Sequence, residues 1–148
     1  MPTRVYLDAC CLNRPFDDQT QGRIRLETEA IVHVLRAVEE GHLTWVSSEV
    51  VAFEISRCPD EDRRLGVEAL LRRATEMVTI SSSALERAKF LRASGLKEFD
   101  AMHLAVAEAA SAAVLVTTDD RFIAAARLQP SSVVRVLNPV TLAAELLQ

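Results

Sequence analysis

Short apolar runs alternate with segments of helical periodicity along the whole chain, and this alternation limits the possible folds more than any other feature. The runs expected to form strands span residues 4–7, 43–46, 77–80, 114–116 and 133–137. Apolar residues recur at helical spacing in segments 23–40, 48–57, 60–73, 81–95, 99–112, 122–128 and 140–147. Strands that alternate with helices predict a parallel sheet covered on both faces. We therefore expect an α/β fold with three layers, α/β/α, around a mostly parallel central sheet of about five strands.

Composition indicates a single domain spanning residues 1–148. Hydrophobic residues make up 49% of the chain and charged residues 26%, which argues against disorder. No apolar stretch approaches the roughly 20 residues of a membrane span, and the N-terminus lacks the apolar core of a signal peptide. The three cysteines show no CxxC spacing, so neither a disulfide framework nor a zinc site is indicated. We expect a soluble cytoplasmic protein without membrane contact.

Acidic residues follow two of the predicted strands directly. Asp8 comes straight after the first strand, and the strand at 114–116 leads through two threonines into Asp119 and Asp120. In open parallel sheets, ligands bind outside the carboxyl ends of the strands, so these carboxylates stand where a site would lie. The alternative is local: Asp119 caps the next helix and Asp120 complements its dipole.

Two further acids lie on helices with large apolar faces. Glu54 falls near the middle of the apolar arc of its helix, so it requires a cationic partner, either a metal or an arginine such as Arg14 or Arg57. Asp100 lies in the first turn of the most apolar helix, where it either caps the helix or faces a site. His103, one turn later, is expected to be a hydrogen-bonded core histidine rather than a general base.

Parallel strands bring their carboxyl ends to one edge of the sheet, so four acids are expected to meet there: Asp8, Glu54, Asp100 and Asp119. An ionised cluster of this kind repels itself unless it binds Mg²⁺ or Mn²⁺, hard cations that accept carboxylate oxygens and keep several waters. Those waters would be the hydrolytic reagent. The formal charge of −4 is unusual for a nucleic-acid binder, but a bound divalent ion reverses the local field around the carboxylates.

Four short segments around these acids resemble, in this order, the PIN domain family (PilT N-terminus type) and, within it, the VapC-like ribonuclease toxins. The segments are Val-Tyr-Leu-Asp8, Val-Ala-Phe-Glu54-Ile, Glu-Phe-Asp100-Ala-Met-His-Leu-Ala and Leu-Val-Thr-Thr-Asp119-Asp-Arg-Phe122. They cover nearly the whole chain. The resemblance implies a PIN-like fold and identifies the four acids as catalytic residues and ligands of Mg²⁺ or Mn²⁺.

The same resemblance assigns supporting roles near the last acid. Thr117 matches the family's threonine two residues before that acid, and is expected to hold the loop or the water shell of the metal. Asp120 is expected in the first turn of the next helix, because Asp119 stands three residues before Phe122 as the family's acid does. Cys10 stands where the family commonly has Asn or Ser, and the polar, proline-broken loop expected at residues 13–18 is unlike the commonest toxins.

The implied activity is metal-dependent hydrolysis of RNA phosphodiester bonds by an endoribonuclease that is the toxin of a type II toxin–antitoxin pair. The implied partners are an RNA substrate, a cognate antitoxin protein and a second copy of the chain. Several arginines are candidates for contacts to RNA phosphates: Arg14, Arg57 and Arg121.

Two other functions are compatible with the same pattern. An aspartate-based phosphotransfer domain would phosphorylate a strand-end aspartate, but a phosphatase of the haloacid dehalogenase type requires a second aspartate where this chain has Cys10. A catalytically inactive PIN-fold protein would keep the fold and act by interaction alone. Phosphoaspartate in mass spectra would favour the first alternative, and the absence of Mn²⁺ binding in calorimetry would favour the second.

Overall fold

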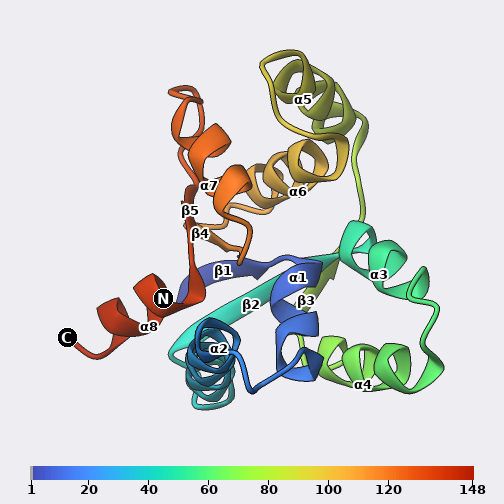
Figure 1. Ribbon diagram of the computed structural model, residues 1–148. Helices are drawn as coiled ribbons and strands as arrows, with labels where there is room; N and C mark the ends of the chain where they lie inside the picture. The colour runs from blue at the N-terminus through green and yellow to red at the C-terminus, as the bar shows by residue number, and fades with distance from the viewer. Residues whose placement is uncertain (1) are drawn as a thin grey trace.

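A five-stranded parallel sheet forms the centre of the computed structural model, which describes residues 2–148 (Figure 1). The strands are β1 (Thr3–Leu7), β2 (Leu43–Ser48), β3 (Glu76–Val78), β4 (Val114–Val116) and β5 (Arg135–Leu137). Their order in the sheet is β3-β2-β1-β4-β5, and each neighbouring pair is parallel. This confirms the predicted α/β fold and its number of strands, and the described sheet is parallel throughout.

Helices cover both faces of the sheet. In Figure 1, α5, α6 and α7 lie on one side, while α1, α2, α4 and α8 lie on the other. The described residues form eight α-helices: α1 (Ala9–Asn13), α2 (Gly22–Glu39), α3 (Glu49–Ser56), α4 (Glu61–Leu71), α5 (Ser82–Ala93), α6 (Glu98–Ala109), α7 (Asp120–Arg127) and α8 (Pro139–Leu146). None of these helices is long and apolar enough to cross a membrane.

The central strands are short and apolar because both of their faces are buried. Val5, Tyr6 and Leu7 of β1 are at most 1% exposed, and all three residues of β4 are buried. A strand covered on both faces has no polar side to alternate with, so it reads as a continuous apolar run. The chain passes from β1 to β2 on one side, whereas β4 joins β1 on the other. The carboxyl ends of β1 and β4 therefore border the position where the strand order reverses, which is where open α/β sheets bind ligands.

The structure corrects the expected loop at residues 13–18. Helix α1 begins directly after β1 with Asp8 as its N-cap, and the 3-10 helix η1 (Arg14–Phe16) follows it. The aspartate satisfies a free N–H group of the first turn of α1, which allows a helix to start at the strand end. Pro15 lies at the start of η1, where its missing N–H leaves no hydrogen bond unmade.

Candidate metal centre

Asp8 is the buried member of the acidic group. It is 5% exposed, and its carboxylate accepts hydrogen bonds from the backbone N–H of Cys11 (3.2 Å) and the thiol of Cys10 (2.8 Å). Burial, together with the neighbouring Cys10, raises the pKa of Asp8 well above its ordinary value of 3.8. The Cys10 sulfur also accepts a hydrogen bond from the hydroxyl of Thr118 (3.1 Å). The thiol thus supplies polar contacts at the position where the resembling family commonly has Asn or Ser.

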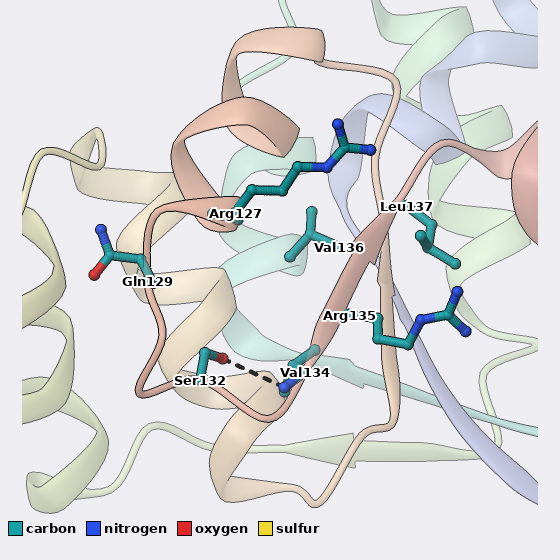
Figure 2. A pocket seen from close by; sticks show the side chains of 8 residues that line it. Arg127, Gln129, Ser132, Val134, Arg135, Val136 and Leu137 are labelled. Atoms are coloured by element: carbon teal, nitrogen blue, oxygen red, sulfur yellow. Dashed lines mark hydrogen bonds between the residues drawn. The ribbon is translucent and has the colours of Figure 1, made fainter.

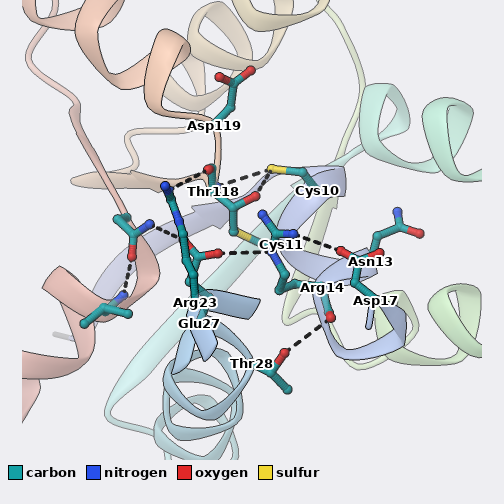
Figure 3. Close-up of polar contacts among 12 residues, drawn as sticks. Cys10, Cys11, Asn13, Arg14, Asp17, Arg23, Glu27, Thr28, Thr118 and Asp119 are labelled. Atoms are coloured by element: carbon teal, nitrogen blue, oxygen red, sulfur yellow. Dashed lines mark hydrogen bonds and ion pairs between the residues drawn. The ribbon is translucent and has the colours of Figure 1, made fainter. Parts of the chain in front are cut away.

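Asp119 and Asp120 follow β4 and face different partners. Asp119 caps α7 by accepting hydrogen bonds from the N–H groups of Arg121 (2.9 Å) and Phe122 (3.3 Å). The side chain of Asp119 points away from the polar cluster below it in Figure 3, whereas both carboxylate oxygens of Asp120 accept hydrogen bonds from Arg23. The prediction that Asp119 caps the helix is therefore confirmed, and Asp120 forms an ion pair with Arg23.

Thr117 connects the end of β4 to this turn. Its hydroxyl accepts a hydrogen bond from the backbone N–H of Asp119 (3.1 Å) and lies 3.3 Å from the sulfur of Cys10. Thr117 is fully buried and its own N–H donates to the carbonyl of Leu137 in β5. The threonine therefore joins the loop of Asp119 to Cys10 and to the neighbouring strand.

Asp100 is influenced by the negative charges of two other acids. It lies in the first turn of α6 and does not cap that helix, because Lys97 occupies the N-cap position. Burial raises the pKa of Asp100 from its ordinary value of 3.8 to about 6, and the negative charges of Asp119 and Asp8 add to the rise. Asp8, Asp100 and Asp119 thus interact across the carboxyl end of the sheet.

Glu54 joins this group through a histidine. His103, which is 2% exposed, forms one hydrogen bond between its Nε2 and the carboxylate of Glu54 and another between its Nδ1 and the hydroxyl of Tyr6 (2.7 Å). The hydroxyl of Tyr6 also lies 2.7 Å from that of Ser48, the N-cap of α3. An ionised carboxylate only accepts hydrogen bonds, so toward such a carboxylate Nε2 is the donor, while either atom of the Nδ1–Tyr6 pair can donate. His103 is the hydrogen-bonded core residue that its position predicted.

Among the residues that the structure describes, no arginine pairs with Glu54, so the predicted alternative of an arginine partner was wrong. The guanidinium of Arg57 lies 5.7 Å from the ring centre of Phe53, and Arg14 forms ion pairs with Asp17 and Glu27. Glu54 itself is half-buried rather than buried. The bond to His103 occupies one of its carboxylate oxygens and orients the other, as partners of metal-binding carboxylates do.

Glu27 is a buried acid that the sequence interpretation missed. It is 1% exposed, and its carboxylate pairs with Arg14 (3.2 Å) and Arg23 (3.3 Å) and accepts a hydrogen bond from Asn138 (2.6 Å), as Figure 3 shows in part. The signal was present, because Glu27 lies between the apolar residues of α2 as Glu54 does on α3. Its cations identify it as a structural ion pair.

The acids of the site differ from Glu27 in lacking such cations. Within residues 2–148, no arginine or lysine nitrogen lies within 4.0 Å of a carboxylate oxygen of Asp8, Asp100 or Asp119. Asp8 and Asp119 raise the pKa of Asp100, and carboxylates without a paired protein cation suit a hard divalent cation, which prefers oxygen ligands. The residues present therefore fit Mg²⁺ or Mn²⁺.

The tightest group of possible ligands in the described part of the chain centres on Asp8. One ligand atom each from Asp8, Cys10 and Cys11 lies within 4.8 Å of the others. Cys11 is fully buried and its thiol donates to the carbonyl of Val116 (3.3 Å), while the thiol of Cys10 donates to Asp8. Both sulfurs thus support the end of β1, and the other three predicted acids, Glu54, Asp100 and Asp119, lie outside this group.

A separate pocket of about 280 Å³ lies between the end of α7 and β5 (Figure 2). Its walls carry no acidic side chain, and Ser132 on its rim accepts a hydrogen bond from the N–H of Val134 (3.3 Å). The residues that line it are Ala126, Arg127, Gln129, Ser132, Val134, Arg135, Val136 and Leu137. This pocket offers no carboxylate for a cation, in contrast to the carboxyl end of the sheet.

The sequence matches the PIN domain family over residues 5–128, a segment that includes all four acids. No curated protein matches the chain. A similar structure is VapBC2 from Rickettsia felis bound to a DNA fragment from its promoter. The TM-score is 0.64 and the identity 15%, covering 90% of this chain and 98% of that chain. A toxin–antitoxin complex from Klebsiella pneumoniae gives a TM-score of 0.60 and 20% identity, covering 91% of this chain and 97% of that chain. DNA-bound VapBC from Salmonella typhimurium gives a TM-score of 0.58 and 16% identity, covering 93% of this chain and 98% of that chain.

Proposed function

Because the chain belongs to the PIN domain family, we propose that it is a metal-dependent endoribonuclease and the toxin of a type II toxin–antitoxin pair. One observation carries the enzymatic part of the proposal. Asp8, Asp100 and Asp119 interact at the end of the sheet without a protein cation in the described chain, whereas the buried Glu27 has two arginines. An uncompensated acidic group is costly to fold, and a bound cation removes that cost.

In this proposal Asp8, Glu54, Asp100 and Asp119 hold Mg²⁺ or Mn²⁺. When bound, the ion supplies Lewis acidity, which lowers the pKa of a coordinated water and stabilises negative charge on phosphate oxygens. The protein's contribution is to fix the ligands. The capping bonds from Cys11 hold Asp8, those from Arg121 and Phe122 hold Asp119, and His103 orients the carboxylate of Glu54.

RNA cleavage with purified protein tests the activity. We expect cleavage of single-stranded RNA in the presence of Mn²⁺ or Mg²⁺, its loss on addition of EDTA, and a fall of at least about 100-fold in Asp100→Asn. Glu76→Gln is the matched control, because Glu76 is an exposed acid on β3 that pairs with Arg4. Undiminished cleavage by Asp100→Asn protein would identify a contaminating nuclease and refute the assignment.

The toxin role is supported by the similarity to toxin–antitoxin structures along nearly the whole chain. We propose a small antitoxin protein as partner and a homodimer as the assembled state. Induction of the chain alone is expected to arrest growth of a bacterial host, and coexpression with the product of a short adjacent reading frame is expected to restore growth. Growth that continues despite confirmed ribonuclease activity would remove the toxin role while leaving the nuclease in place.

A further inference from the structure

The guanidinium of Arg23 contacts the chain on both sides of Asp119. Its Nη1 and Nη2 each donate a hydrogen bond of 2.8 Å to the carboxylate of Asp120, and Nη2 also donates to the backbone carbonyl of Thr118 (3.4 Å). Arg23 lies on α2, 97 residues away in sequence from Asp120. A single side chain from the opposite layer therefore contacts the residues on both sides of Asp119, one of the proposed metal ligands.

Arg23 is itself held by a buried anchor. Its Nε pairs with Glu27 one turn later on α2, and the same carboxylate is held by Arg14 and by the amide of Asn138. Asn138 also caps α8 through the N–H of Val140 (2.8 Å). The contact of Arg23 on both sides of Asp119 is thus attached to the packed pair of helices α2 and α8.

The surroundings of Arg23 do not suit an anion-binding site. The pocket of about 400 Å³ beside it includes three arginines, but two of them, Arg14 and Arg23, already pair with carboxylates. An RNA phosphate placed there would compete with those carboxylates for the same donors. The arrangement instead resembles that of an outer-shell partner, which fixes a metal ligand without contacting the metal.

Stability alone does not account for this contact. The side chains of Arg23 and Asp120 are 56% and 66% exposed, and such surface ion pairs contribute little to folding stability. The bidentate geometry fixes position more than it adds free energy. We propose that Arg23 is a positioning residue for Asp119, holding it through Thr118 and Asp120 in the arrangement that binds the cation. The part of this inference that concerns the cation rests on the proposed function.

The experiment compares Arg23→Gln and Arg23→Lys with Arg135→Gln in otherwise intact protein. Arg135 is as exposed as Arg23 and forms a bidentate pair with Glu145, so its loss reports the cost of breaking such a pair. Calorimetric titration with Mn²⁺ measures metal affinity, and hydrogen exchange of metal-free protein measures the order of residues 117–123. Thermal unfolding measures global stability.

We expect both Arg23 variants to weaken Mn²⁺ binding by about 10-fold or more. Their melting temperatures should fall below that of Arg135→Gln, because Arg23 also pairs with the buried Glu27. Exchange at residues 117–123 should accelerate in the Arg23 variants and not in Arg135→Gln. Lysine is expected to fail because it keeps the charge but lacks the planar fork that reaches both partners. Wild-type affinity in Arg23→Lys would show that charge alone is required and would overturn the positioning role, as would unchanged exchange in both variants.

The outcomes separate this inference from the proposed function. If wild-type protein binds Mn²⁺ but cleaves no RNA, the nuclease proposal fails and the titrations still decide the role of Arg23. If wild-type protein does not bind Mn²⁺, the metal site fails. The exchange of residues 117–123 in metal-free protein then decides whether Arg23 holds the loop of Asp119.

Discussion

Replacing Asp100 by asparagine should stabilise the metal-free protein at neutral pH and leave it unchanged in acid. Burial and the charges of Asp119 and Asp8 raise the pKa of Asp100 from 3.8 to about 6. Between these values the native state binds more protons than the unfolded state, so stability falls as pH rises through the native pKa. An asparagine does not titrate, so the variant avoids this fall.

The size of the effect follows from the pKa. A rise from 3.8 to about 6 corresponds to roughly 3 kcal/mol of unfavourable free energy in the ionised form, at about 1.4 kcal/mol for each tenfold change. Asp100 is only partly buried, and solvent screening reduces this figure to about 1.5 kcal/mol. For a domain of this size the gain above pH 7 is roughly 3–6 °C in melting temperature.

The assay is thermal and urea unfolding of wild type and Asp100→Asn in EDTA at pH 4 and pH 7.5. Asp62→Asn is the matched control, because Asp62 also lies in the first turn of a helix but is exposed on α4. The change in stability of Asp62→Asn reports the loss of a helix-dipole interaction at a carboxylate outside the acidic site. A difference between Asp100→Asn and wild type that is the same at both pH values would refute the reasoning. Addition of Mn²⁺ at pH 7.5 should reverse the order of stability.

Four other substitutions test the site and its surroundings. Tyr6→Phe should cost about 1–3 kcal/mol in urea unfolding because its hydroxyl serves two buried partners, whereas Ser47→Ala should change stability by less than about 0.5 kcal/mol because that buried hydroxyl has no partner in the described structure. Glu27→Gln should cost about 3 kcal/mol in the same assay, since it leaves two arginines without their buried carboxylate. Glu54→Gln should weaken Mn²⁺ binding at least about 10-fold in calorimetry while the melting temperature stays near wild type, because Glu54 is half-buried.

Periodicity predicted the sheet and the position of the acids because both depend on local pattern. A strand buried on both faces has to be apolar, and a carboxylate that follows it directly has to lie at the sheet edge, as Asp8 does after β1. The start of α1 was missed because it depends on a capping hydrogen bond from the N–H of Cys11 to the carboxylate of Asp8. Apolar periodicity does not reveal such a bond. Strand β5 was expected two residues too early, since apolar Val133 lies outside its hydrogen-bonded pairing with β4.

Partnerships between distant side chains are what the sequence does not specify. Glu54 required a cation or donor, but only the packing of α3 against α6 selects His103 instead of an arginine. The contact of Arg23 with Asp120 depends in the same way on how α2 and α7 meet around the sheet. Glu27 could have been found, because an acid among the apolar positions of α2 required a partner just as Glu54 did on α3.

The pairing of the arginines bears on how an acidic protein would attract RNA. Arg63, in the basic run of α4, donates to Asp17, so its charge is already compensated. Of the three arginines predicted to contact phosphates, Arg14 is paired with carboxylates. Arg57 and Arg121 form no ion pair within residues 2–148. Because the chain has a formal charge of −4, the positive charge of a bound cation would contribute strongly to attraction of a phosphodiester. RNA binding should therefore depend on the divalent ion, and metal-free protein should retain little affinity even at low salt.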